Sequence, residues 1–241
     1  MTTEHRLTDA ARDKLKRVSV ATLTTCLFKH GFKSQLIQNV RPIDPTGKRL
    51  VGEAYTLRMI PAREDLATPA ILSDRKYPAR AAIEACPPGH VLVIDSRKDP
   101  RGASGGDILM TRLQVRGVAG CVTDGGMRDC ADIAAMGFPV YQLQPAAPIS
   151  LVQHLAIETN VPIACGDAPV FPGDIIVGDA EAVVVLPAHL ANTLADEAFE
   201  MTAYEDFAVE AVRGGALLFD VYPANPESKA KFAEWRKARG R

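Results

Sequence analysis

Residues 105–142 read GGDILMTRLQVRGVAGCVTDGGMRDCADIAAMGFPVYQ, and this stretch decides the fold. Its hydrophobic pattern predicts a helix over 108–116, a buried strand over 118–123, a helix over 129–136 and a strand over 138–142. Strands that alternate with helices usually pair in parallel through right-handed crossovers. The stretch therefore predicts an α/β fold with parallel strand pairing.

The flanking segments extend this unit on both sides. Upstream we expect helices over 7–18 and 20–30, a strand over 51–60, a mostly helical segment over 66–85 with a break at Tyr77-Pro78, and a strand over 90–94. Downstream we expect short strands over 161–165 and 168–170, a β-hairpin over 175–187, and helices over 188–212 and 227–238. We therefore predict one domain over 1–241, with N-terminal helices (1–50), an α/β core (51–187) and C-terminal helices (188–241). The central sheet is expected to be mostly parallel.

Composition excludes several classes of protein. The chain has 241 residues and a formal net charge of -1, which argues against general nucleic-acid binding. No apolar run approaches a membrane span, and the polar N-terminus lacks the core of a signal peptide. The five cysteines contain no C-x-x-C pair and the five histidines no H-x-x-x-H pair, so a disulfide framework or a zinc site is not supported. We expect a cytoplasmic protein without a nucleic-acid or membrane partner.

Charged side chains lie where predicted strands end and predicted helices begin. Asp95 and Asp124 end strands, Asp107 opens a helix, and Arg128 and Asp129 open the next one. In parallel sheets, ligands gather at the carboxyl ends of the strands, so these side chains are expected to face one crevice. Carboxylate oxygens suit Mg²⁺, while helix N-terminal N–H groups and arginine suit an organic carboxylate. The sequence thus predicts a metal-dependent site for a small oxo-acid.

Simpler structural roles are open for several of these residues. Aspartate often caps a helix, and both Asp107 and Asp129 occupy suitable positions. The pair Gly105-Gly106 also suits a plain turn. Arg128 fits a structural role less well, because arginine at a helix N-terminus opposes the helix dipole. We expect Asp124 to fix the turn or to position Arg128 rather than to bind metal.

Two motifs make the chain similar to a known family. Gly105-Gly106-Asp107, followed about twenty residues later by Arg128-Asp129, resembles the D-x20-R-D signature of the RraA-like proteins, which include the class II 4-hydroxy-4-methyl-2-oxoglutarate aldolases. The segment VRGVAGCVTDGGMRD (115–129) resembles the core of that family. VFPGDIIVGDAEAVVVLP (170–187) resembles its late hairpin, with Ala182 in place of a glycine. The resemblance covers most of the chain.

The resemblance implies a three-layer β/β/α swivelling-domain architecture and a class II aldolase. Such a lyase cleaves a 4-hydroxy-2-oxo-acid to release pyruvate and decarboxylates oxaloacetate through the same enolate. It also implies Mg²⁺, or Mn²⁺ or another divalent cation, associated with Asp129 and Asp107 largely through water. The implied substrate-binding residues are Ser104, Gly105, Gly106, Asp107, Ile108 and Arg128, with backbone N–H groups of 104–108 receiving the carboxylate.

Family members form trimers or dimers of trimers with active sites between subunits, so self-association is implied. A glutamate from the neighbouring subunit's long helix reaches the site in that family. Glu205 is the best match here, with Asp206, Glu200 and Glu210 as alternatives. The implied catalytic residues are then Arg128, Asp107 and Glu205. The identity of the general base stays open, and a water held by a carboxylate is one candidate.

Two segments depart from the family pattern. Tyr77-Pro78 and its surroundings are longer than usual, and Arg63-Glu64-Asp65 replaces a Gly-Asp-Asn type of turn. Both are candidates for the distal wall of a substrate pocket, so the natural substrate stays open. Two other functions also stay open: a non-catalytic regulator that binds a ribonuclease, and a metal-dependent dehydratase of a sugar-derived oxo-acid.

Overall fold

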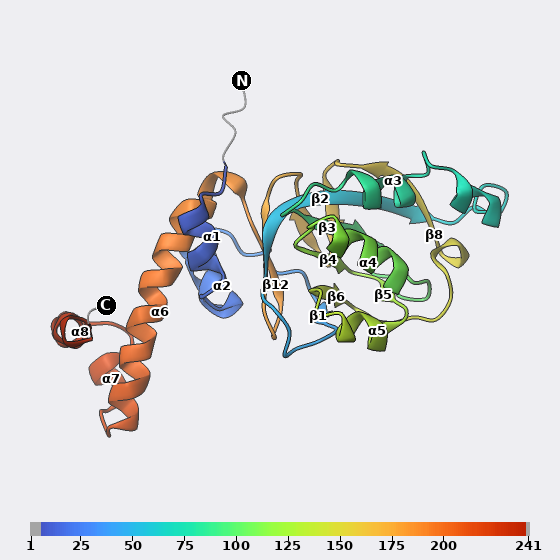
Figure 1. Ribbon diagram of the computed structural model, residues 1–241. Helices are drawn as coiled ribbons and strands as arrows, with labels where there is room; N and C mark the ends of the chain where they lie inside the picture. The colour runs from blue at the N-terminus through green and yellow to red at the C-terminus, as the bar shows by residue number, and fades with distance from the viewer. Residues whose placement is uncertain (1–5, 240–241) are drawn as a thin grey trace.

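A mixed α/β fold is formed by residues 6–239, which the computed structural model describes (Figure 1). Residues 1–5 and 240–241, including His5, Arg241 and the ends of the predicted domain, lie outside the described part. The strands of the main sheet are β1 (Arg41–Pro42), β2 (Leu50–Pro61), β3 (Val91–Asp95), β4 (Gly120–Thr123), β6 (Val140–Gln142), β8 (His154–Thr159), β11 (Ile175–Gly178) and β12 (Val183–Leu186). They lie in the order β1-β6-β4-β3-β2-β11-β12, and β8 also pairs with β2.

The prediction of a mostly parallel sheet was wrong. Within residues 6–239 the ladders β2–β3, β3–β4 and β4–β6 are parallel, whereas β1–β6, β2–β11, β11–β12 and β2–β8 are antiparallel. The cause is the 12-residue length of β2. Residues 50–53 of β2 pair with β11, and residues 57–61 pair with β8, which the sequence pattern had not indicated as a strand. The sheet is therefore parallel only at its centre.

Helices cover one face of the parallel centre. They are α3 (Pro78–Ala85), α4 (Asp107–Val115) and α5 (Cys130–Ala135). Along β3, Leu92 and Ile94 belong to the core beneath these helices, whereas Val91 and Val93 belong to a second core shared with β11 and β12. Successive strand residues point to opposite faces, so this strand is buried on both. Its carboxyl end is thereby held rigidly beside the start of α4.

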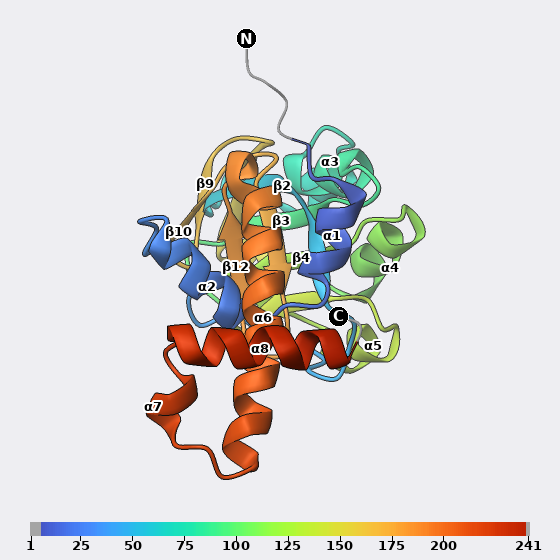
Figure 2. The same ribbon diagram turned by 90° about the vertical axis from the view of Figure 1, so that its left-hand side faces the viewer.

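A second group of helices lies beyond β12, away from α3–α5 (Figure 1). It comprises α1 (Asp9–Leu15), α2 (Val20–Lys29) and α6 (Ala191–Arg213), which share a third core with β11 and β12. The side chain of Ser19 accepts a hydrogen bond from the Thr22 N–H and caps α2. The chain then continues through α7 (Leu218–Val221) into α8 (Pro226–Ala238), which crosses α6 (Figure 2). The C-terminal helical extension is confirmed.

Short elements complete the described chain. The strand pairs β5 (Gly126–Met127) with β7 (Gln144–Pro145) and β9 (Ile163–Cys165) with β10 (Ala168–Val170) form two small sheets. The 3-10 helices are η1 (Pro69–Ser73), η2 (Ser150–Val152) and η3 (Ala188–Leu190). The segment expected to be mostly helical over 66–85 is helical only in η1 and α3. Thr68 and Tyr77, which precede Pro69 and Pro78, have non-helical backbone angles, as residues before proline commonly do. In the described chain, every helix is too short or too polar to cross a bilayer.

The buried histidine of β8 makes stability depend on pH. The side chain of His154 is fully buried, with its Nε2 3.0 Å from the Asp99 carbonyl oxygen and its Nδ1 3.2 Å from an Arg97 guanidinium nitrogen. A neutral ring satisfies both contacts by donating from Nε2 and accepting at Nδ1. Burial, assisted by Arg97, lowers the pKa of His154 below its usual 6.5 and outweighs the hydrogen bond to Asp99.

We expect the free energy of unfolding to fall as the pH drops below about 6.5, because His154 is then protonated in the unfolded chain but stays neutral in the folded protein. The contribution of the neutral His154 to stability is fully present above the pKa of His154 in the unfolded chain. It is lost as the pH falls towards the lower pKa of His154 in the folded protein. Urea unfolding at pH 7.5 and pH 5.5 measures this loss. A His154→Gln variant should be less stable at pH 7.5 but should lose less on acidification. An equal loss in both proteins would contradict the role of His154.

Candidate active site

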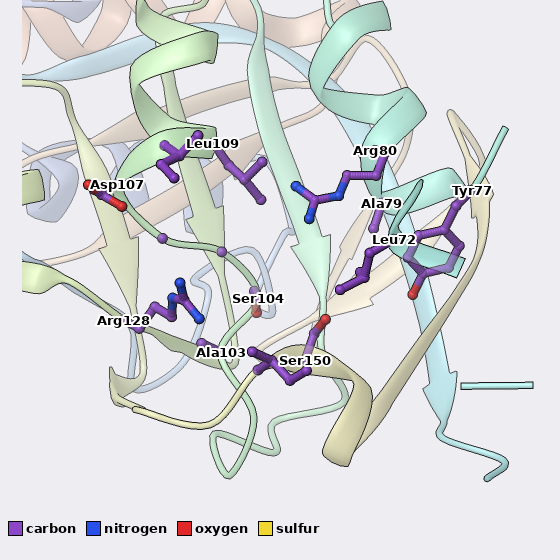
Figure 3. Close-up of a pocket in the computed structure, with 14 residues that line it drawn as sticks. Leu72, Tyr77, Ala79, Arg80, Ala103, Ser104, Asp107, Leu109, Arg128 and Ser150 are labelled. Carbon is purple, nitrogen blue, oxygen red and sulfur yellow. The ribbon is translucent and has the colours of Figure 1, made fainter. Parts of the chain in front are cut away.

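A pocket of about 250 Å³ lies between α3, the start of α4 and the segment that contains η2 (Figure 3). This volume is close to the lower end of the roughly 300–1,000 Å³ that is typical of small-molecule sites. The lining residues come from four parts of the chain: Leu72, Tyr77, Ala79, Arg80; Ala103, Ser104, Gly105, Gly106, Asp107, Ile108, Leu109; Arg128; and Ile149, Ser150.

The Gly105-Gly106-Asp107 turn and Arg128, which were singled out together in the sequence, meet at this pocket. The Arg128 N–H donates to the Gly105 carbonyl oxygen at 3.1 Å, which ties the two loops together. A Cβ on Gly106 would lie 2.5 Å from Asp129 Oδ2 and 3.0 Å from Arg128 Cγ. A side chain at position 106 would therefore displace the Asp129 carboxylate and the Arg128 side chain, so close approach favours glycine there. The helix-plus-strand unit between the motifs brings them to one edge of the sheet, as predicted.

The start of α4 offers unpaired backbone donors. The Ser104 N–H donates to the Gly126 carbonyl oxygen at 2.7 Å, so it is not available to a ligand. Within residues 6–239, the N–H groups of residues 105–108 have no backbone acceptor. Unpaired N–H groups at a helix N-terminus bind anions, and here they line the pocket. Of the N–H groups of 104–108 that were assigned to a ligand carboxylate from the sequence, those of 105–108 are therefore available.

Arg128 is positioned by its neighbour in sequence. Arg128 Nε donates to Asp129 Oδ2 at 3.1 Å, which leaves the two terminal nitrogens of the guanidinium without a hydrogen bond to the described residues. Asp129 precedes α5 with a φ of 56°, and its side chain makes no capping bond. The capping alternative is therefore not realised for Asp129. A left-handed backbone at an aspartate beside a pocket is a feature that functional sites often contain.

Asp107 is the first residue of α4, and the helix has no side-chain cap. The Asp107 carboxylate forms no hydrogen bond or salt bridge with any residue between 6 and 239, and it is only partly buried. No group of three or more His, Cys, Asp or Glu side chains that could hold a metal occurs in that range. Magnesium commonly uses one or two carboxylates and keeps several waters. Asp107 lines this pocket, whereas Asp129 lines a neighbouring hollow that shares Arg128 with it. Both carboxylates are of the type that binds a partly hydrated hard cation.

Asp124 has the structural role that the sequence suggested. Its Oδ1 accepts from the Ser96 N–H at 2.7 Å, and its Oδ2 accepts from the N–H groups of Lys98 and Gly166 at 3.1 Å each. The side chain is 1% exposed. Burial raises the pKa of Asp124, although its N–H donors act in the opposite direction. Asp124 therefore joins three loops behind the pocket.

Several lining residues were not predicted from the sequence. Arg80, Ile149 and Ser150 line the pocket, and the Ser104 hydroxyl lies within 2.8 Å of the Thr123 hydroxyl behind it. The signal for Arg80 was its position in the first turn of α3, where arginine opposes the helix dipole. These groups gather only because α3 and η2 pack beside α4.

Of the two segments proposed for the distal wall, one reaches the pocket. Tyr77 lines it, whereas Arg63-Glu64-Asp65 does not. Arg63 instead pairs with Asp65 at 2.7 Å on the surface.

The acidic residues of α6 lie outside this pocket in the same chain. Glu205 Oε2 accepts from the Thr22 hydroxyl at 3.0 Å, while Glu200 and Glu210 pair with Arg236 and Arg239. Figure 1 shows α6 on the far side of β12 from α4. A role for Glu205 at the pocket therefore requires a second copy of the chain.

Over residues 6–239 the structure is a mixed α/β protein with a pocket in which unpaired backbone N–H groups lie beside Arg80 and Arg128. Residues 7–185 match the family model described as RraA-like, Aldolase/RraA. The chain therefore belongs to the RraA-like family.

Relatives in sequence support the same family. A protein of Halalkalibacterium halodurans named "Putative 4-hydroxy-4-methyl-2-oxoglutarate aldolase" is 29% identical over 189 residues, which cover 78% of this chain and 83% of that protein. An uncharacterised protein of Methanocaldococcus jannaschii is 34% identical over 185 residues, which cover 77% of this chain and 83% of that protein.

Solved structures share the fold. Streptomyces coelicolor RraAS2, described as an unusual member of the RNase ES inhibitor RraA protein family, has a TM-score of 0.73 and 29% identity over 84% of this chain and 97% of its own. An uncharacterised protein of Pseudomonas syringae pv. tomato has a TM-score of 0.76 over 89% of this chain and 98% of its own. At 21% identity, the second comparison shows the fold alone.

Proposed function

We propose that the chain is a divalent-metal-dependent lyase that cleaves the C3–C4 bond of a 4-hydroxy-2-oxo-acid and releases pyruvate. The observation that carries this proposal is the meeting of three unused groups in one small pocket. They are the N–H groups of 105–108, the terminal nitrogens of Arg128 and the carboxylate of Asp107. The aldolase names of several relatives support a lyase.

The substrate is held at its 2-oxo-acid end. Its carboxylate accepts hydrogen bonds from the N–H groups of 105–108, where the helix dipole favours negative charge. The terminal nitrogens of Arg128 donate to the 2-oxo oxygen, which becomes the enolate oxygen during the reaction. Asp129 keeps the guanidinium in place through Nε, so little reorganisation is needed when the charge develops.

The bond-breaking step then needs a proton acceptor near C4. Asp107, or a water that it holds, takes the proton of the C4 hydroxyl, and C4 becomes a carbonyl as the C3–C4 bond breaks. The electron pair of that bond forms the enolate, and protonation at C3 gives pyruvate. With oxaloacetate, the same bond breaks with loss of carbon dioxide and leaves the same enolate. One site thus serves both reactions.

Asp107 and Asp129 would hold the cation, with Mg²⁺ the first candidate and Mn²⁺ an alternative. When bound, a divalent cation supplies Lewis-acid stabilisation of the charge at the 2-oxo group. Self-association as a trimer or a dimer of trimers is part of the proposal, because Glu205 could complete the pocket only from another subunit. The proposed architecture is the three-layer β/β/α swivelling domain of this family.

A second candidate is supported by the likeness to RraAS2, whose description names RNase ES inhibition. A regulator of that kind would bind a ribonuclease and would not need an unpaired arginine and carboxylate in a pocket. The present pocket retains both groups, which favours the lyase.

A panel of 2-oxo-acids tests the proposal. The purified chain is incubated with 4-hydroxy-4-methyl-2-oxoglutarate or oxaloacetate, with Mg²⁺ or with EDTA, and pyruvate is measured with coupled lactate dehydrogenase. We expect Mg²⁺-dependent pyruvate release from both acids, above the metal-catalysed background of a heat-inactivated sample. Absence of turnover on the whole panel would reject the lyase and favour the regulator. Equal rates with Mg²⁺ and with EDTA would reject the metal dependence and leave a metal-independent lyase.

A further inference from the structure

The pocket contains a second arginine that the proposed reaction does not use. Arg80 extends from the first turn of α3, and Figure 3 shows Arg80 and Arg128 reaching towards the pocket from opposite sides. Arg80 forms no salt bridge or side-chain hydrogen bond with any described residue, although it is partly buried. Glu84, on the next turn of α3, pairs instead with Arg112 of α4 at 2.8 Å. An unpaired guanidinium in a pocket calls for an anionic ligand.

The surroundings of Arg80 also favour an anionic ligand. Apolar side chains line the pocket around it, namely Leu72, Ala79, Leu109 and Ile149. Such walls lower the local dielectric and strengthen a charge-assisted hydrogen bond to a ligand. The lining side chains carry two positive charges, on Arg80 and Arg128, and one negative charge, on Asp107, which leaves one positive charge. A bound cation would increase that excess.

We infer that Arg80 binds the second carboxylate of a dicarboxylic substrate, and that it is the residue that discriminates against monocarboxylic oxo-acids. This inference rests on the proposed function and adds a specificity-determining residue to it. The N–H groups of 105–108 and Arg128 hold the 2-oxo-acid end, and Arg80 holds the tail across the pocket.

A matched pair of ligands tests the inference without turnover. 2-Oxoglutarate and 2-oxopentanoate have the same carbon chain and differ in a terminal carboxylate or methyl group. We expect the wild-type protein with Mg²⁺ to bind 2-oxoglutarate more tightly in calorimetry. Arg80→Met should reduce that preference by roughly ten- to a hundredfold and leave 2-oxopentanoate binding within about twofold. Arg75→Met, on the exposed turn before α3, is the control and should keep the preference.

Kinetics separate this inference from the proposed function. For 4-hydroxy-4-methyl-2-oxoglutarate, Arg80→Met should raise KM far more than it lowers kcat, whereas for 4-hydroxy-2-oxopentanoate both constants should stay near wild type. If pyruvate is released but Arg80→Met treats the two substrates as the wild type does, the role of Arg80 is wrong and the lyase stands. If no substrate is cleaved, the lyase is wrong while the calorimetric preference still reports on Arg80. A wild type that binds neither five-carbon acid overturns the inference.

Discussion

Replacing Arg128 with alanine is expected to lower kcat for pyruvate release by roughly a hundred- to a thousandfold, because the enolate oxygen loses its preorganised donors. The fold should survive, since the Arg128 side chain is 42% exposed and makes a single ion pair. Steady-state kinetics on oxaloacetate, with urea unfolding on the same sample, measures both effects. Arg128→Lys should recover only part of the activity, because lysine cannot present two parallel donors.

The matched control for this variant is Arg63→Ala. Both arginines pair with an aspartate close in sequence, but Arg63 is exposed and lies outside the pocket. We expect wild-type kinetics from Arg63→Ala, although the sequence alone had placed it on the distal wall. Wild-type turnover by Arg128→Ala would contradict the proposed role of Arg128. A loss of turnover in Arg63→Ala would show that the substrate binds near Arg63 and not in the pocket described above.

Local signals explain which parts of the fold were predictable. The run from Val118 to Thr123 is apolar and bounded by Gly117 and Asp124, so its strand could be read from neighbours in sequence. The strand β8 had no such signal. It forms by pairing with the end of β2, where Pro61 faces His154 across almost a hundred residues. Pairing over that distance depends on tertiary packing, so the mixed character of the sheet was not visible in the sequence.

The same distinction applies to the pocket. Asp107 and Arg128 were predictable as neighbours because each follows a strand of the parallel centre, and parallel strands end at one edge. Arg80 comes from α3, whose position depends on the core it shares with α4, in which Ala82 and Ile83 pack with Met110 and Leu113. Side chains brought together by helix packing leave no fixed spacing in the sequence. The proximity of the 105–108 N–H groups to Arg128 was therefore predictable, whereas the opposite wall of the pocket was not.

The largest effect on stability is expected at Asp124. An Asp124→Ala variant would leave the N–H groups of Ser96, Lys98 and Gly166 without their acceptor in a site that is 1% exposed. Each buried unsatisfied donor costs about 1–3 kcal/mol. Partial rescue by water makes a total loss of roughly 3–5 kcal/mol reasonable, which is a large share of the ~5–15 kcal/mol that stabilises a typical domain.

Urea unfolding of a graded series isolates the cause. Asp124→Asn retains one acceptor oxygen but turns an amide group towards a backbone donor, so we expect a smaller loss of roughly 1–3 kcal/mol. Asp167→Asn is the control, because Asp167 is 66% exposed, pairs with Lys98 Nζ at 2.6 Å, and has a left-handed backbone that asparagine tolerates. It should change stability by less than about 0.5 kcal/mol. If Asp124→Ala unfolds like the wild type while turnover disappears, Asp124 acts in the chemistry and its structural role is wrong.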